Sequence, residues 1–324
     1  MGKNGTIDKI NGNFKGKDIV SLRQFDQASI KKIFATTTKL SEIAKKSKPS
    51  SLLAGNIITL LFYEPSSRTF GSFSAATKRL GGQTVDIINP QVFSSVSKGE
   101  TFDDTIRVFE KYSDLIVIRH PEKGSAVRAA EIASIPVINA GDGIGEHPTQ
   151  TSLDIYTIYE KFKSLDNMVG VFAGDMLNGR TVKSLIRAMS LYKNNTAYLL
   201  SPKELKLSRE DFEDFKKSGV KLIEIESEKD MPKNAHFWYW TRTQKERFPS
   251  EEAYERVKNK FILTKKLVNE FAGRDTIFMH PLPRVGEILT EVDDDPRAVY
   301  LRSQVPNGMY VRMALLALVL GKVK

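Results

Sequence analysis

Short runs of β-branched and aromatic residues alternate with longer amphipathic segments along nearly the whole chain. This alternation is typical of βα units around a parallel sheet, so the sequence predicts an α/β fold. Nine runs have the length and composition of strands: residues 57–63, 84–88, 115–118, 136–139, 168–173, 196–200, 221–225, 237–240 and 276–279. The first four lie in one half of the chain and the other five in the second half. We therefore expect two doubly wound domains, each a parallel β-sheet flanked by helices.

The length of 324 residues also indicates two domains. Residues 101–112 and 151–162 have helical periodicity, and the second helix, opened by His147-Pro148-Thr149, is expected to bridge the domains. Residues 309–320 are strongly apolar but too short to span a bilayer, so they predict a buried helix. The expected domains are residues 1–149 with residues 305–324 packed back on them, and residues 150–304. The active site is expected in the cleft between them.

The composition excludes several classes of protein. The chain has no cysteine, which rules out disulfides, thiolate zinc sites and a cysteine nucleophile. The formal charge of +10 could indicate nucleic-acid binding, but pairs such as Lys45-Lys46 and Lys216-Lys217 are scattered, as on a solvated surface. The first dozen residues are polar and rich in glycine, and they predict a loose tail with no secretory leader. We therefore expect a cytoplasmic protein that binds neither membranes nor nucleic acid.

Polar clusters follow five of the predicted strands. They present Arg, Ser, Thr or His at residues 64–69, 119–121, 174–181, 241–244 and 280–284. Ligands of open α/β sheets bind beyond the carboxyl ends of the strands, where guanidinium groups and helix-start N–H groups can hold phosphate or carboxylate. The Ser66–Thr69 stretch, expected just before a helix over residues 72–80, suits a phosphate. One such tetrapeptide is more often an N-cap beside a surface arginine, but its repetition at several strand ends indicates an anion site.

Three of the four histidines directly precede proline, which holds the preceding residue in an extended conformation. They are His120, His147 and His280. We expect structural roles for His120 and for the fourth histidine, His236. His147 is the functional candidate, because it shares a short loop with Thr149 and Gln150 ahead of a helix.

A competing motif lies at residues 174–181, GDMLNGRT. It fits the P-loop pattern G-x-x-x-x-G-K-[ST] except that Arg180 replaces the lysine. Asp175 would also place negative charge near the phosphates of a nucleotide. A nucleotide-hydrolysing P-loop is therefore disfavoured.

The clusters resemble those of the aspartate and ornithine carbamoyltransferases, from about Phe14 to Gly321. The matching segments, in the order of the aspartate branch, are FYEPSSRT, SKGET, RHP, NAGDG, EHPTQ, GRTVKSL, TRTQKERF, HPLPR and NGMYVRMALLALVLG. The resemblance implies transfer of the carbamoyl group of carbamoyl phosphate to the amino group of L-aspartate, an early step of pyrimidine biosynthesis. It implies no cofactor or metal. The domain at residues 1–149 would bind carbamoyl phosphate, and the domain at residues 150–304 would bind aspartate.

The resemblance also implies the roles of individual residues toward carbamoyl phosphate. The implied ligands are Ser66, Ser67, Arg68, Thr69, Ser94, Lys98, Arg119, His147, Gln150, Pro281 and Leu282. Arg119 would bridge the phosphate and the carbamoyl oxygen, His147 and Thr69 would donate to that oxygen, and Gln150 would bind the NH2 group. The catalytic set would be Arg68, Thr69, Lys98, Arg119 and His147.

For aspartate, the implied ligands are Lys98, Arg180, Arg242, Gln244 and Leu282. Glu64 would form ion pairs with Arg180 and Arg247 that hold the domains closed. Ser94 and Lys98 would reach into the site of a neighbouring chain, so the resemblance implies a homotrimer with shared active sites. A regulatory subunit is a further possible partner that the sequence leaves open.

Two positions depart from the family pattern. Phe70 stands where the family often has arginine, and His236 stands where an acidic residue is common. Two alternatives also stay open. An ornithine-specific enzyme is disfavoured because the guanidinium of Arg242 would repel an ammonium group, and a non-catalytic, nucleic-acid-binding relative is disfavoured by the complete set of site residues.

Overall fold

The computed structural model describes residues 7–143, 145–258 and 260–323. It divides into two compact units. Unit 1 contains the described residues up to Tyr156 and those from Asn307 onward, and unit 2 runs from Thr157 to Pro306. Each unit has its own parallel sheet, which confirms the predicted α/β fold. All nine predicted strands are present, with ends that differ by at most a few residues.

The sheet of unit 1 has the strand order β2-β1-β3-β4. Its strands are β1 (Ile57–Phe62), β2 (Gln83–Ile88), β3 (Leu115–His120) and β4 (Val137–Asp142). All neighbours pair in parallel, so the carboxyl ends of the four strands share one edge. The central strands β1 and β3 are almost entirely buried, because helices cover both faces of the sheet.

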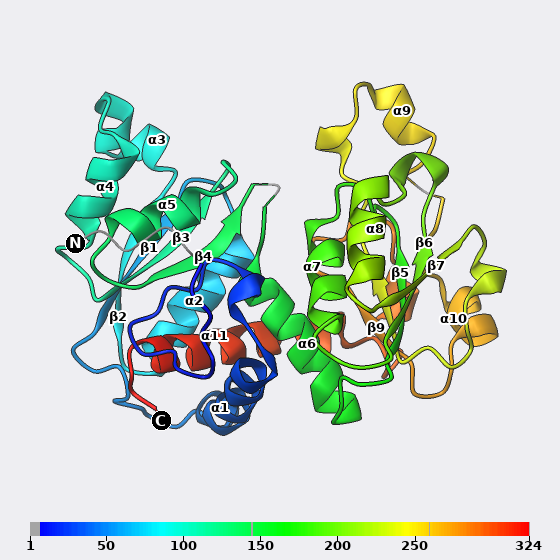
Figure 1. Ribbon diagram of the computed structural model, residues 1–324, viewed down its shortest axis with the longest axis horizontal. Coiled ribbons are helices and arrows are strands. Elements are labelled where there is room, and N and C mark those ends of the chain that lie inside the picture. Colours follow the sequence, from blue (N-terminus) through cyan, green and yellow to red (C-terminus); the bar gives the residue numbers. More distant parts are fainter. Residues whose placement is uncertain (1–6, 144, 259, 324) are drawn as a thin grey trace. The chain divides into compact units, whose positions relative to one another are not determined.

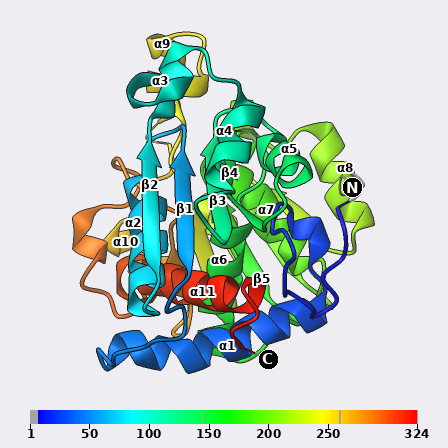
Figure 2. The ribbon, with the colours of Figure 1, turned by 90° about the vertical axis from the view of Figure 1, so that its left-hand side faces the viewer.

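The helices of unit 1 are α1 (Gln27–Lys45), α2 (Ser67–Arg79), α3 (Pro90–Phe93), α4 (Phe102–Phe109), α5 (Ser125–Ile132), most of α6 (Pro148–Phe162) and most of α11 (Val305–Val319). Helices α4 and α5 lie on one face of the sheet and α2 lies on the other (Figures 1 and 2). Leu61, Ile116 and Ile118 pack with Ala126 and Ala129 of α5 in one of these layers. The carboxyl edge of the sheet is therefore held by packed layers on both sides.

The last helix, α11, is the buried helix that its apolar composition predicts. Its residues from Tyr310 to Val319 are all buried, including the charged side chain of Arg312. In the parts of the chain that the structure describes, no helix has both the length and the hydropathy needed to cross a membrane.

The sheet of unit 2 has the strand order β7-β6-β5-β8-β9, again all parallel. Its strands are β5 (Val169–Ala173), β6 (Thr196–Leu200), β7 (Lys221–Ile225), β8 (Phe237–Trp240) and β9 (Ile277–Met279). Its helices are α7 (Arg180–Met189), α8 (Arg209–Lys217), α9 (Glu251–Glu255) and α10 (Lys265–Phe271). Helices α7 and α8 lie on one face and α10 on the other (Figure 1).

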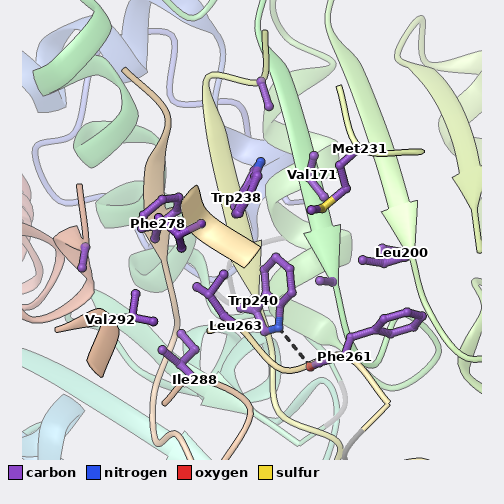
Figure 3. Close-up of a cluster of buried hydrophobic side chains, with 14 of the residues drawn as sticks. Val171, Leu200, Met231, Trp238, Trp240, Phe261, Leu263, Phe278, Ile288 and Val292 are labelled. Atoms are coloured by element: carbon purple, nitrogen blue, oxygen red, sulfur yellow. Dashed lines mark hydrogen bonds between the residues drawn. The ribbon is translucent and has the colours of Figure 1, made fainter. Parts of the chain in front are cut away.

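A cluster of large aromatic side chains forms the core on one face of this second sheet. Trp238, Trp240 and Phe278 are fully buried there (Figure 3). The indole Nε1 of Trp240 donates a hydrogen bond of 3.1 Å to the carbonyl oxygen of Phe261. These aromatic residues hold β8 and β9 side by side, and the polar segments that follow both strands start from this rigid base.

The N-terminal segment differs from the expectation. Residues 1–6 lie outside the described residues, but the prediction of a loose tail is wrong for the residues that follow. Ile10 is only 1% exposed, and its N–H donates to the carbonyl oxygen of Gln24 at 2.9 Å. Ile19 forms a parallel bridge to Ile138 of β4. Ile10 and Ile19 of this polar segment are therefore part of the core of unit 1.

Candidate active site

The segment after β1 leads directly into α2. Ser66 is the N-cap residue, and Ser67 begins the helix. The prediction that residues 66–69 precede a helix starting at residue 72 is therefore wrong. Phe73, with Ala76 and Thr77, is buried at helical spacing, and this packing outweighs the unfavourable Gly71 in the first turns. As a result, the N–H groups of the first turn lie at the edge of the sheet as donors for an anion.

Arg119, at the end of β3, lies in a mostly buried position beside α2. Its Nη2 is 3.2 Å from Oε2 of Glu64, and its Nη1 donates to the carbonyl oxygen of Ala140 at 3.1 Å. Burial lowers the pKa of Arg119, the Glu64 carboxylate opposes that shift, and the positive charge of Arg68 lowers the pKa further. The buried Nε of Arg119 has no hydrogen-bond partner among the described residues.

His147 and Gln150 lie at the start of α6, after the neighbouring strand β4. His147 is 5% exposed, and its Nδ1 is 3.3 Å from the hydroxyl oxygen of Thr149. Gln150 donates from Nε2 to Oδ1 of Asp154 at 3.0 Å. Since β1, β3 and β4 are adjacent, the helix start at Ser67, the guanidinium of Arg119 and the His147 segment all follow neighbouring strand ends.

His120 and His236 have local contacts that fit the structural roles predicted for them. Nδ1 of His120 accepts a hydrogen bond from the N–H of Glu122 at 3.1 Å, and its ring lies 4.5 Å from that of Tyr63. Nδ1 of His236 accepts from the N–H of Val169 at 3.0 Å, and its ring lies 5.1 Å from that of Phe162. Burial lowers the pKa of both histidines, which favours their neutral form.

In unit 2, the segment before α7 and the segment after β8 are joined by hydrogen bonds. The N–H of Asp175 donates to Oγ1 of Thr241 at 3.2 Å, and Gln244 donates from Nε2 to the carbonyl oxygen of Asn178 at 3.0 Å. Arg180 is the first residue of α7, and Arg242 lies between the two residues of the second segment that make these bonds. The two arginines predicted to bind aspartate therefore lie on two segments that are hydrogen-bonded to each other.

A further hydrogen bond argues against a P-loop at residues 174–181. Asp175 is fully buried, and its Oδ1 accepts from the N–H of Asn178 at 2.9 Å. A carboxylate thus occupies an N–H group that a P-loop would offer to a phosphate. Burial raises the pKa of Asp175, although the hydrogen bonds from Asn178 and Gln244 oppose the shift.

The segment after β9 is held by a buried histidine–glutamate pair. Nε2 of His280 is 2.6 Å from Oε1 of Glu287, and Nδ1 of His280 accepts from the N–H of Leu282 at 2.8 Å. Oε2 of Glu287 accepts from the N–H of Val285 at 2.9 Å. Leu282 has a φ of +57°, which is unfavourable for a residue with a branched side chain. Pro281 and Leu282, both predicted ligands, are thus held in an irregular conformation at the edge next to β8.

Sequence reasoning did not assign Glu287 a role. Its signal is weak, because a single glutamate seven residues after a histidine has no motif spacing. The only hint is that His280 follows an apolar strand directly, where a buried histidine needs a hydrogen-bond partner.

The remaining predicted site residues lie in less enclosed positions. Ser94 donates to the carbonyl oxygen of Pro90 at 2.8 Å, and its oxygen accepts from the N–H of Val96 at 3.2 Å. Lys98 and Arg247 are exposed. Glu64 contacts Arg119 within unit 1, so its predicted pairs with Arg180 and Arg247, and the reach of Ser94 and Lys98 into another chain, stay predictions.

The departure at Phe70 has a packing role, since its ring meets that of Phe62 edge-on at 5.5 Å. The described residues contain no group of three or more His, Asp or Glu side chains that could hold a metal ion.

Two parallel α/β units whose strand ends carry arginines and buried histidines define a class of protein that binds small anionic ligands. Residues 17–160 match the family model described as aspartate/ornithine carbamoyltransferase, carbamoyl-P binding domain. Residues 166–319 match the model of the Asp/Orn binding domain of the same family. The chain belongs to the aspartate/ornithine carbamoyltransferase family.

Similar proteins include an aspartate carbamoyltransferase, a larger multifunctional protein and a solved aspartate transcarbamoylase structure. The aspartate carbamoyltransferase catalytic subunit of Methanosarcina acetivorans is 46% identical, covering 96% of this chain and 99% of that protein. The multifunctional protein pyr1-3 of Dictyostelium discoideum is 44% identical, but the chain spans only 14% of its length. A solved structure of aspartate transcarbamoylase from Trypanosoma cruzi in complex with carbamoyl phosphate and aspartate matches with a TM-score of 0.87 and 36% identity, over 97% of this chain and all of that one.

Proposed function

We infer that this protein is an enzyme that transfers the carbamoyl group of carbamoyl phosphate to the amino group of L-aspartate. The products are N-carbamoyl-L-aspartate and phosphate, in an early step of de novo pyrimidine biosynthesis. One observation carries the assignment of the site: the mostly buried guanidinium of Arg119 lies at the end of β3, beside the strand β1 whose end leads into the start of α2 at Ser67 and Arg68. Guanidinium groups and helix-start N–H groups at one edge of a sheet suit a doubly charged phosphate.

The domain at residues 1–149, with residues 305–324, binds carbamoyl phosphate in this proposal. The phosphate ligands are Ser66, Ser67, Arg68 and Thr69 at the start of α2, and Arg119 at the end of β3. His147 donates to the carbamoyl oxygen and Gln150 accepts from the carbamoyl NH2 group. This division is supported by the helix-start N–H groups and by the partly desolvated guanidinium of Arg119.

The domain at residues 150–304 binds aspartate. Arg180 contacts the α-carboxylate, while Arg242 and Gln244 contact the β-carboxylate. The backbone of Pro281 and Leu282 orients the amine and the carbamoyl group. The hydrogen bonds that join the Asp175 and Gln244 segments support this division, since they hold both arginine-bearing segments together.

The chemistry requires a neutral amine that attacks the carbamoyl carbon. The tetrahedral intermediate places negative charge on the former carbonyl oxygen, and the leaving phosphate gains charge as the bond to it breaks. Donors already in place at those positions lower the barrier, and the positioning of the two substrates lowers it further. The phosphate of the substrate takes the proton of the amine, so no separate general base is needed.

The proposed assembly is a homotrimer in the cytoplasm, with Ser94 and Lys98 of each chain completing the site of a neighbour. The exposed position of Lys98 fits this role. Mixing Lys98→Ala chains with Arg119→Ala chains tests it directly. Mixed trimers should regain part of the activity, because one kind of site then contains both intact residues. If two inactive chains stay inactive after mixing, the shared site is wrong.

A colorimetric assay of carbamoyl aspartate beside carbamoyl ornithine tests the reaction itself. We expect product with aspartate and none with ornithine, since Arg242 would face the ammonium group of ornithine. Product with ornithine alone would replace the proposal with the other branch of the family. A salt-sensitive shift with DNA and no product from either amine would favour a non-catalytic, nucleic-acid-binding protein.

A further inference from the structure

Unit 1 buries two opposite charges that the proposed reaction does not use. Arg312 of α11 is 4% exposed and Asp154 of α6 is fully buried. Burial lowers the pKa of Arg312 to about 10, and the charge of Asp154 opposes that shift. Removing two charges from water costs several kcal/mol before their attraction is counted. Such a pair is therefore a candidate for a specific role rather than for simple stabilisation.

The guanidinium of Arg312 lies where α2, α6 and α11 meet. Its central carbon is 5.2 Å from the centre of the Phe73 ring in α2. Gly308, one turn earlier in α11, provides the space, because a Cβ atom there would lie 2.8 Å from Nη1 of Arg312. Nη2 donates to Oγ1 of Thr149 at 3.3 Å. The buried cation thus contacts the start of α6, where the predicted carbamoyl ligands lie.

The chemistry of these groups fixes the direction of the hydrogen bonds. A guanidinium group can only donate, so the Thr149 oxygen accepts from Arg312. The single hydroxyl hydrogen of Thr149 is then directed to Nδ1 of His147, 3.3 Å away. A neutral imidazole that accepts at Nδ1 carries its proton at Nε2. Arg312 therefore makes Nε2 of His147 a hydrogen-bond donor.

Asp154 has the opposite effect on Gln150. An ionised carboxylate can only accept, so the amide of Gln150 turns Nε2 toward Oδ1 of Asp154, at 3.0 Å. The other end of the amide, the Oε1 oxygen, is then the atom presented to a ligand. Asp154 therefore makes Gln150 a hydrogen-bond acceptor.

A carbamoyl group has the matching asymmetry, since its oxygen accepts and its NH2 group donates. We propose that Arg312 and Asp154 are positioning residues that set the hydrogen-bonding direction of the two carbamoyl ligands, His147 as donor and Gln150 as acceptor. The inference rests on the proposed function for the identity of the ligand. It also gives a reason why Arg312 and Asp154 are buried next to the predicted carbamoyl ligands.

The other histidines show why His147 needs such a device. Nδ1 of His120, His236 and His280 accepts in each case from a backbone N–H group. A backbone donor cannot turn round, so these three rings hold their proton at Nε2 when they are neutral. Nδ1 of His147 instead faces a hydroxyl, which can donate or accept. A further donor behind the hydroxyl, here Arg312, removes that ambiguity.

The first experiment measures the tautomer of His147 in the full-length protein by 15N NMR of labelled histidine side chains. Replacing Arg312 itself would leave the Asp154 carboxylate buried without its cation and would destabilise the fold, so Thr149 is changed instead. In the unaltered protein and in Thr149→Ser, we expect one tautomer with a protonated Nε2. In Thr149→Val we expect mixed tautomers and a kcat lower by roughly 3- to 10-fold, the effect of one buried hydrogen bond.

Thr151→Val is the matched control. Thr151 is also buried near the start of α6, and its hydroxyl has no hydrogen-bond partner among the described residues. This variant should keep the single tautomer of His147 and its kcat. A single unchanged tautomer and a normal kcat in Thr149→Val would overturn the role of Arg312. The NMR readout needs no turnover, so this failure differs from a failure of the proposed reaction, in which the unaltered protein forms no carbamoyl aspartate.

A double-mutant cycle tests the second part of the proposal, the effect of Asp154 on Gln150. Asp154→Asn should raise the KM for carbamoyl phosphate by about 3- to 10-fold, because an asparagine can accept or donate and lets the Gln150 amide turn over. In a Gln150→Ala background the same change should raise KM less, because the part of its effect that acts through Gln150 is already lost. Equal effects of Asp154→Asn in both backgrounds would overturn the proposed orientation of Gln150.

Discussion

Two histidine–proline segments, one in each unit, follow the same sequence pattern but are held in place differently. His147-Pro148 opens α6, so the backbone behind it is fixed by the hydrogen bonds of a helix. His280-Pro281 opens an irregular segment, which is fixed by the Glu287 side chain through two hydrogen bonds of 2.6 and 2.9 Å. Both histidines are buried.

The difference indicates where each unit is sensitive to mutation. A helix start keeps its geometry when one side chain is removed, so changes in unit 1 should affect ligand binding and catalysis more than folding. An irregular segment has no such repeating support. Changes to its side-chain contacts in unit 2 should therefore affect stability and substrate binding together.

The largest effect is expected at the ligands that face developing charge in unit 1. Arg119→Ala should lower kcat by a factor on the order of 100 to 1,000, as for loss of a donor to an oxyanion. Arg107→Ala is the control, because Arg107 is an exposed arginine of the same unit that pairs with Asp104 at the surface. Near-normal turnover in Arg119→Ala would refute the carbamoyl-phosphate assignment.

Arg242→Ala tests the contrasting role of unit 2. Loss of a charge-assisted hydrogen bond to the β-carboxylate should raise the KM for aspartate by roughly 10- to 100-fold. The kcat at saturating aspartate should fall much less than in Arg119→Ala, since this carboxylate does not change charge during the reaction. Arg209→Ala, an exposed arginine at the first position of α8, serves as the control. Equal losses of kcat in Arg242→Ala and Arg119→Ala would remove the distinction between the units.

Most of the fold follows from the sequence, because each strand is a short apolar run between polar turns. The start of α2 was harder to predict. Gly71 and the serines near it weaken the helical signal, and only the packing of Phe73 against the sheet shows that the helix begins at Ser67. Ile10 was missed for a similar reason, since one apolar residue among polar neighbours has no periodicity to reveal that it is buried.

The candidate site was predictable where the predicted ligands sit in motifs at strand ends, as Arg119 does at the end of β3. Its supporting residues were not. Arg312, Asp154 and Glu287 act through contacts between segments that are far apart in the chain or have no characteristic spacing. A single sequence contains no record of which hydroxyl or carboxylate a buried side chain will meet.

Glu287→Ala should cost about 1–3 kcal/mol of unfolding free energy, because the buried Nε2 of His280 and the N–H of Val285 both lose their acceptor. Glu287→Gln should cost less, since the amide oxygen can still accept one of these bonds. Glu291→Ala is the matched control, because Glu291 accepts a single bond from the N–H of Lys265 at 2.9 Å in an exposed position. Denaturant unfolding measures all three. A normal stability of Glu287→Ala would show that the segment does not depend on this carboxylate.

The same carboxylate predicts a dependence on pH. Burial alone would raise the pKa of Glu287, but the hydrogen bond and charge of His280 and the N–H of Val285 bring it below the ordinary value of 4.5. A group whose pKa is lowered by folding stabilises the folded state above the unfolded pKa, and this stabilisation is lost as the pH falls through the folded pKa. The stability difference between the unaltered protein and Glu287→Gln should therefore shrink as the pH falls below 4.5.

The smallest effect on stability is expected at the N-cap of α2, and a second helix provides the contrast. The side chain of Ser66 makes no capping hydrogen bond, whereas Oγ1 of Thr264, the N-cap of α10 in unit 2, accepts from the N–H of Leu267 at 3.1 Å. Thr264→Ala should cost about 1 kcal/mol, and Ser66→Ala only a few tenths. Ser66→Ala should nevertheless raise the KM for carbamoyl phosphate, which Thr264→Ala should leave unchanged. If Ser66→Ala instead lowers stability and leaves this KM unchanged, Ser66 is an ordinary N-cap residue. The start of α2 would then be no better adapted to a ligand than the start of α10.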